Sequence, residues 1–246
     1  MDATKSVRSF SVDPRFFTLY VVGLMVAATV AIWASTWTPA PATGQGRAAF
    51  LAALAPPVIG MVMILAGSIR RRGSEPIGPA DLVTVLRAAL VSVVAAWAVL
   101  GLLSPGGTGG WPLTILATVA LLLDGLDGAV ARRSRPTRAG ATLDAETDAV
   151  MMLALSVIVA ADVGWWIVLA GALRYLFALT RAIRPAWRRP LPARRSRRAV
   201  AAWSSGLLAA CTAPLLAGAP ATALSVVALG LLLWSFGRDV AWLQRG

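Results

Sequence analysis

The sequence contains no histidine, one cysteine and one lysine among its 246 residues. Without histidine, the chain cannot build a histidine-based catalytic triad, a histidine metal site or an imidazole proton shuttle. A single cysteine, Cys211, excludes a disulfide within the chain, and its apolar neighbours indicate a buried, unreactive thiol. Any chemistry that the protein performs therefore depends on carboxylates, arginines and hydroxyl groups.

Charged residues are also scarce, at 14%, whereas 58% of the residues are hydrophobic. Uncharged runs close to the length of a bilayer-spanning helix follow one another along the chain, so the sequence predicts an all-α, polytopic transmembrane helical bundle. The net charge of +12 would suggest nucleic acid as the partner of a soluble protein. Here the arginines fall between hydrophobic runs, which indicates membrane orientation and contact with membrane lipids rather than nucleic acid.

We expect about eight spans, since a helix needs about 20 apolar residues to cross the hydrocarbon core. They cover residues 16–35, 48–69, 81–103, 111 to about 124, 144–161, 165–183, 199–217 and 219–237. Pro56 and Pro57 predict a kink in the second span. A cleavable signal peptide is the alternative interpretation of residues 1–42, because Ala40-Pro41-Ala42 resembles a cleavage site, but the first apolar run is longer than usual.

The basic residues indicate the orientation of these spans. With the amino terminus inside, 20 of the 23 lysines and arginines fall in the tail and loops of one side. This bias predicts an integral protein of the plasma or inner membrane with both termini in the cytosol.

Residues 124–148 concentrate five of the eleven acidic residues of the chain: Asp124, Asp127, Asp144, Glu146 and Asp148. On helices, this spacing gives two stripes, one of Asp124, Asp127, Gly128 and Ala131, and one of Gly140, Asp144 and Asp148. Carboxylates that face each other this closely repel unless cations neutralise them, and ligands that are all oxygen suit Mg²⁺. An aspartate at the bilayer centre costs about 3 kcal/mol, so we expect a polar cavity that opens to the cytosol.

The same segment resembles the signature of the CDP-alcohol phosphatidyltransferase family. The pattern reads Asp124-x-x-Asp127-Gly128-x-x-Ala131-Arg132, seven residues, then Gly140-x-x-x-Asp144-x-x-x-Asp148. Thr84 and Arg87 resemble the Asn-x-x-Thr-x-x-Arg opening of the first core helix of the family, with Asp81 where asparagine is usual. The resemblance covers roughly residues 79 to 240 and implies two parts. Residues 1–75 form a tail and two accessory helices, and residues 76–246 form a six-helix catalytic core.

The resemblance implies the reaction and the roles of the residues. A CDP-alcohol lipid, typically CDP-diacylglycerol, transfers its phosphatidyl group to an acceptor hydroxyl and releases CMP in phospholipid biosynthesis. Mg²⁺ or Mn²⁺ is the implied cofactor, with Asp124, Asp127, Asp144 and Asp148 as metal ligands and Asp148 also as the general base. The implied CDP-binding residues are Gly128, Ala131, Arg132, Gly140, Thr84 and Arg87. A homodimer is compatible with the resemblance.

The acceptor is less well indicated by the sequence. Arg174 lies near the middle of a span, and eight arginines fall within residues 181–198, including Arg194 and Arg195. These three arginines are candidates for binding an anionic acceptor, although the cluster also fits a membrane anchor and Arg174 also fits a structural ion pair. Simple snorkelling to the interface is the alternative for Arg87.

Two other functions compete with phosphatidyl transfer. A magnesium-dependent membrane prenyltransferase also uses aspartates, but it does not need the glycine, alanine and arginine positions of the motif. A cation transporter also carries intramembrane acids, but these are expected along a pathway across the membrane rather than at one end of the helices.

Overall fold

The computed structural model describes residues 18, 20–21, 23–24, 44–72, 79–103, 110–131, 138–184, 187, 189, 191–192 and 194–244. These ranges hold seven long helices and no strand, which confirms the all-α prediction for this part of the chain. The helices are α2 (Gly44–Arg72), α3 (Pro79–Leu103), α4 (Trp111–Ala131), α5 (Arg138–Val163), α6 (Val168–Ile183), α7 (Arg195–Cys211) and α8 (Ala219–Gln244). Two short 3₁₀ turns, η1 (Trp165–Ile167) and η3 (Pro214–Leu216), lie between the later helices.

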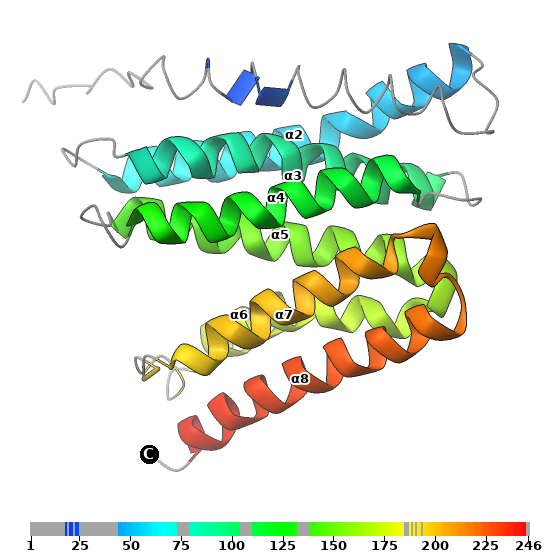
Figure 1. Cartoon of the computed structure of the whole chain (residues 1–246). Helices are drawn as coiled ribbons and strands as arrows, with labels where there is room; N and C mark the ends of the chain where they lie inside the picture. The colour runs from blue at the N-terminus through cyan, green and yellow to red at the C-terminus, as the bar shows by residue number, and fades with distance from the viewer. Residues whose placement is uncertain are drawn as a thin grey trace, which may run out of the picture.

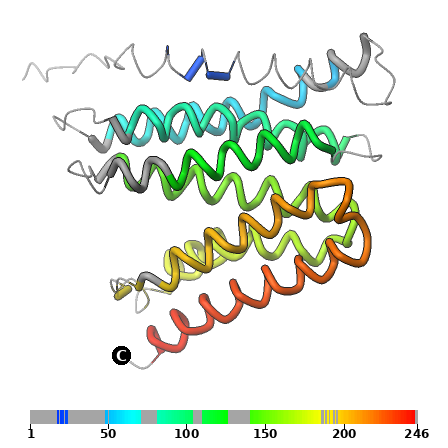
Figure 2. The backbone as a smooth tube through the Cα atoms, viewed as in Figure 1, coloured from blue at the N-terminus to red at the C-terminus, as the bar shows by residue number. Residues whose placement is uncertain are grey.

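Helix α3 lies at the centre of one half of the bundle. It packs against α2, α4 and α5, whereas α5 also packs against α6 and α7, and α7 pairs with α8. Figure 1 shows consecutive helices running in opposite directions, and the backbone path in Figure 2 shows the same arrangement. Small buried residues such as Ala88, Ala89 and Ala117 let the helices approach closely. As a result, the beginnings of α3 and α5 and the end of α4 meet at one end of the bundle.

Four helical segments of the described residues are long and apolar enough to cross a membrane. They are Leu51–Arg70, Asp81–Leu103, Trp165–Ile183 and Ala219–Gln244. Large apolar side chains on them face outward, among them Met63, Leu179 and Leu233. The helices therefore indicate an integral membrane protein.

The expected number of about eight spans is not confirmed. The apolar part of α4 is shorter, at Trp111–Gly125. In α5, charged residues limit the uncharged run to residues 149–161, and in α7 the run extends from residue 199 to the end of the helix at Cys211. Both runs fall short of the about 20 residues of a typical span. Most of the first expected span, and the possible cleavage site near residue 42, lie outside the described residues.

The segments that precede the six-helix core contact α3. The Tyr20 hydroxyl lies 3.0 Å from Ser92 Oγ, and both side chains are buried. Gly23 faces Leu86 and Ala89 so closely that a Cβ atom would lie 2.8 Å from the Leu86 side chain. Helix α2 continues through the two prolines expected to kink it, and its first part slants away from the rest of the bundle (Figure 1).

At the end of the bundle opposite the acidic motif, two turns are fixed by hydrogen bonds. Asp162 Oδ2 accepts a bond of 2.9 Å from the Gly218 amide, which joins the end of α5 to the beginning of α8. Gly164 and Gly218 have φ values of 100° and 79°, which other residues rarely adopt, so these tight turns require glycine.

Candidate active site

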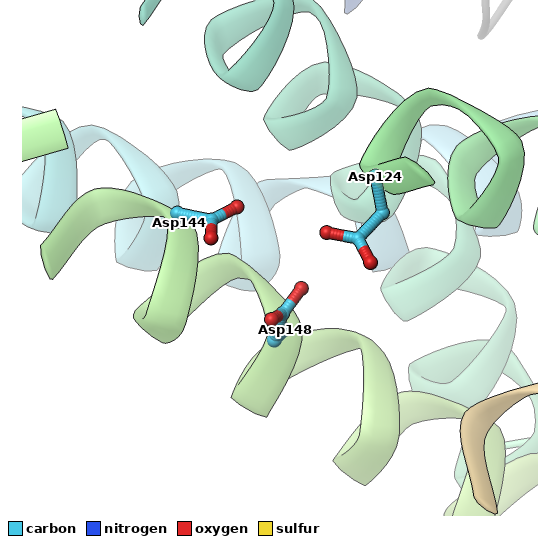
Figure 3. A group of neighbouring side chains, drawn as sticks. All are labelled: Asp124, Asp144 and Asp148. Atoms are coloured by element: carbon cyan, nitrogen blue, oxygen red, sulfur yellow. The ribbon is translucent and has the colours of Figure 1, made fainter. Parts of the chain in front are cut away.

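Three of the four motif aspartates converge at the end of the bundle where α3 and α5 begin. Asp124 projects from α4, whereas Asp144 and Asp148 project from consecutive turns of α5, and the three side chains point toward one another (Figure 3). One carboxylate oxygen from each lies within 4.8 Å of the others. The helical spacing read from the sequence therefore brings these three carboxylates together.

Arg87, on α3, lies between these carboxylates. Its Nη1 atom is hydrogen-bonded to Asp124 and lies 3.0 Å from Asp148 Oδ1. Its Nη2 atom contacts the Asp144 carboxylate and donates a bond of 3.3 Å to the Asp144 carbonyl. Only 3% of the Arg87 side chain is exposed, compared with 33–51% for the three aspartates. The guanidinium therefore lies on the buried side of the site, and the carboxylates lie on the side that is open to solvent.

The donor set fits a hard divalent cation. All three groups supply oxygen, which Mg²⁺ and Mn²⁺ prefer, and three carboxylates against one guanidinium leave a formal charge of −2. Opposite ligands of an octahedral Mg²⁺ ion lie about 4.2 Å apart, because each bond is about 2.1 Å long. The three carboxylate oxygens lie within 4.8 Å of one another, so small side-chain movements bring them to the spacing of Mg²⁺ ligands.

The other positions of the acidic motif are described less fully. Asp127, Gly128 and Ala131 belong to α4, but their side chains lie outside the described part of the structure, and so does all of Arg132. Gly140 is partly exposed in the first turn of α5. The proposed roles of these residues remain predictions.

Thr84 and Arg87 were both expected to contact the CDP group. Together with Asp81 they lie on one buried face of α3, and Thr84 is only 4% exposed. Arg87 contacts the aspartates rather than opening toward a ligand. In this conformation, neither side chain presents much surface to a nucleotide.

Arg174 and Arg194, two of the three arginines considered for the acceptor, pair with different carboxylates. Arg174 Nη2 lies 3.1 Å from Glu146, and 43% of its side chain is exposed, so it makes a structural ion pair. Arg194 Nη1 lies 3.8 Å from Asp239 on α8. Arg195 begins α7, but its side chain lies outside the described residues.

A second charged cluster, which the sequence analysis missed, surrounds Asp239. The Asp239 side chain is 5% exposed and accepts a hydrogen bond of 2.8 Å from Arg197 Nη2. The hollow at this position is shallow and has no interior volume for even a water molecule, and it is lined by Arg194, Ser196, Arg197, Ser235, Arg238 and Asp239. An acid within an apolar span is itself a signal of function or of ion pairing, and it could have identified Asp239.

The arginine cluster and the aspartates belong to the same end of the bundle. Helices α5 and α7 pack against each other and both begin at this end (Figure 1). A ligand held near the beginning of α7 would therefore lie close to the acidic site.

A family-level similarity to known proteins agrees with this geometry. No curated protein and no solved structure matches the chain. The family model described as CDP-alcohol phosphatidyltransferase matches residues 79–243, which include α3 to α8 and every position of the acidic motif. The chain therefore belongs to the CDP-alcohol phosphatidyltransferase family, whose members are divalent-metal-dependent membrane transferases of substituted phosphate groups.

Proposed function

We propose that the protein transfers the phosphatidyl group of CDP-diacylglycerol to the hydroxyl group of a phosphate-bearing acceptor and releases CMP. The observation that supports this proposal most directly is the convergence of Asp124, Asp144 and Asp148 from two consecutive helices that both pack against α3. A diphosphate and several carboxylates repel one another in one pocket unless divalent cations separate them. The acidic site thus suits a nucleotide diphosphate only together with Mg²⁺ or Mn²⁺.

The four motif aspartates, Asp124, Asp127, Asp144 and Asp148, would hold the divalent ion. When bound, it supplies positive charge that stabilises the phosphate oxygens as the leaving group departs. Gly128, Ala131, Arg132 and Gly140 are the proposed contacts of the cytidine phosphate, because small residues leave room for it and a guanidinium pairs with phosphate.

Asp148 is the proposed general base. It is the most exposed of the three described aspartates, at 51%, so a substrate hydroxyl can approach it. The acceptor oxygen forms a bond to the phosphatidyl phosphorus while the bond from that phosphorus to the CMP oxygen breaks. The proton of the acceptor hydroxyl passes to the Asp148 carboxylate, and CMP leaves with the bonding electron pair.

The charge around the shallow hollow beside Asp239, and not a preformed cavity, supports an anionic acceptor. Arg194, Arg197 and Arg238 contribute three positive charges to its lining and Asp239 contributes one negative charge, which leaves a formal charge of +2. Guanidinium groups pair with phosphate through two parallel hydrogen bonds, so this lining suits a phosphate group better than a neutral alcohol.

We also propose that the site and both termini lie in the cytosol. The acidic motif lies among the segments that hold 20 of the 23 basic residues, and such segments remain on the cytosolic side. Substrates and products that are soluble would then exchange directly with the cytosol.

The activity is tested by Asp124→Asn in the full chain. We expect loss of at least about 100-fold in CMP release from CDP-diacylglycerol, because the variant removes a charged ligand but keeps the size of the side chain. Asp162→Asn is the matched control, since Asp162 lies at the opposite end of α5 and an asparagine oxygen still accepts the Gly218 bond. Full activity of Asp124→Asn, or activity in excess chelator, would contradict the proposal.

Donor and acceptor are then identified by separate screens. Labelled CDP-diacylglycerol is offered with glycerol phosphate, inositol phosphate, inositol and serine, and the product lipid is identified by mass. We expect product only with phosphate-bearing acceptors. CMP release from a CDP-linked headgroup alcohol in the presence of diacylglycerol would instead identify a different donor and would refute the choice of CDP-diacylglycerol.

A further inference from the structure

Arg87 occupies the position at which the three carboxylates could share a cation. Both terminal nitrogens of its guanidinium are engaged, Nη1 with Asp124 and Asp148 and Nη2 with Asp144. The Oδ1 atoms in these contacts are oxygens that a divalent ion bound by the same three residues would use. The two cations therefore compete for the same electron pairs.

We propose that Arg87 is the resident counter-ion of the ion-free site, and that a divalent ion binds by displacing its guanidinium from these carboxylates. The inference rests on the proposed metal site. It assigns Arg87 a role different from the nucleotide contact implied by the sequence resemblance. Arg87 is in this sense a positioning residue, since it acts through Asp124, Asp144 and Asp148.

Charge repulsion explains why such a counter-ion is needed. Without Arg87, the three described carboxylates would bring three negative charges within 4.8 Å of one another. Such groups must either take up protons or move apart, and moving apart would pull α4 or α5 away from its position against α3. Arg87 links both helices to α3, so the acidic site keeps its shape before an ion arrives.

The same contacts must weaken the binding of the ion. A divalent cation gains the attraction of the carboxylates but breaks the ion pairs of a guanidinium that is 3% exposed. A buried charge that loses its partners is costly unless another anion replaces them. Removal of Arg87 should therefore have opposite effects on two properties. The ion-free fold becomes less stable, and the affinity for the ion rises.

The experiment compares the full-length wild type with Arg87→Gln in detergent, without nucleotide and at constant ionic strength. Thermal unfolding is recorded in chelator and in saturating Mg²⁺, and Mn²⁺ binding is measured from the electron paramagnetic resonance signal of the free ion. We expect Arg87→Gln to unfold at least about 4 °C lower in chelator. We also expect its Mn²⁺ dissociation constant to be about tenfold lower, which corresponds to about 1.4 kcal/mol.

Arg197→Gln is the matched control. It also removes an arginine paired with a buried carboxylate, Asp239, but it leaves the acidic site intact. Its unfolding temperature should fall equally with and without Mg²⁺, and its Mn²⁺ dissociation constant should stay within about twofold of the wild type.

A Mn²⁺ dissociation constant of Arg87→Gln that is unchanged or raised would overturn the inference, because an arginine that only supports the ligands weakens binding when removed. If Arg87→Gln is unfolded in chelator, recovery in Mg²⁺ supports the inference. Absence of recovery in saturating Mg²⁺ overturns it, because the ion would then fail to replace the charge that the variant lacks. A wild type that binds no Mn²⁺ would refute the metal site and the proposed function as well, so the two failures are distinguishable.

Discussion

Replacement of Asp239 by asparagine should destabilise the protein. The carboxylate is 5% exposed and pairs with Arg197 at 2.8 Å and with Arg194 at 3.8 Å. Loss of one partner of a fully buried ion pair costs about 3–5 kcal/mol. Here the arginines are 36% and 25% exposed, and water can solvate them after the change, so we expect about 1–2 kcal/mol. In a chain of this size that lowers the unfolding temperature by about 2–8 °C.

The same substitution should improve the binding of an anionic acceptor. The formal charge of the hollow rises from +2 to +3 when Asp239 loses its charge, and Arg194 and Arg197 become available to the ligand. The KM for glycerol phosphate should fall about threefold at low salt, and the difference should shrink as salt screens the charges. Arg238→Gln should have the opposite effect on KM, since it lowers the formal charge to +1 while Asp239 keeps both ion pairs.

Two measurements check this pair of effects. Tryptophan fluorescence follows thermal unfolding, and CMP release at varied acceptor concentration gives KM and kcat at two salt concentrations. An increase in stability, or a KM that moves in the same direction in Asp239→Asn and Arg238→Gln, would refute the hollow as an anion site. A protein that uses neutral acceptors as well as charged ones would refute it too.

Two further predictions concern packing and orientation. Gly171→Ala places a Cβ atom 2.4 Å from the Leu153 backbone, so α6 must move away from α5, and we expect a loss of about 1–3 kcal/mol in stability, measured by thermal unfolding. On a Cys211→Ser background, Ser74→Cys should react with an impermeant thiol reagent only after the membrane is opened, whereas Ser104→Cys should react in intact cells, and the reverse result would contradict the cytosolic orientation.

The acidic motif was predictable because it depends on helix periodicity alone. Asp144 and Asp148 are four residues apart, so any helix places them on one face, and two apolar helices joined by a short basic segment must run antiparallel. Asp124 then meets them across the helix pair. Local spacing thus predicted the convergence of these three aspartates.

The role of Arg87 could not be predicted from helix periodicity. It lies on a third helix, 37 residues before Asp124, and its partners depend on how α3 packs against both acidic helices. From its position in the sequence, Arg87 could extend to the membrane interface, contact a nucleotide or form an ion pair. Only the packing of the helices distinguishes these three possibilities. The pairing of Asp239 with Arg194 and Arg197 escaped prediction for a related reason, because it joins residues more than 40 positions apart.

The depth of the charged groups explains why an arginine accompanies the aspartates. With a rise of about 1.5 Å per residue, Arg87 lies about 12 Å from the beginning of α3, and Asp124 lies about 10 Å from the end of α4. Asp144 lies about 9 Å from the beginning of α5, so all three reach a similar depth below the same end of the bundle. An unpaired aspartate well inside a bilayer costs about 3 kcal/mol. A cation of the chain at the same depth lowers this cost before a divalent ion arrives, and Arg87 is the buried cation that contacts all three carboxylates.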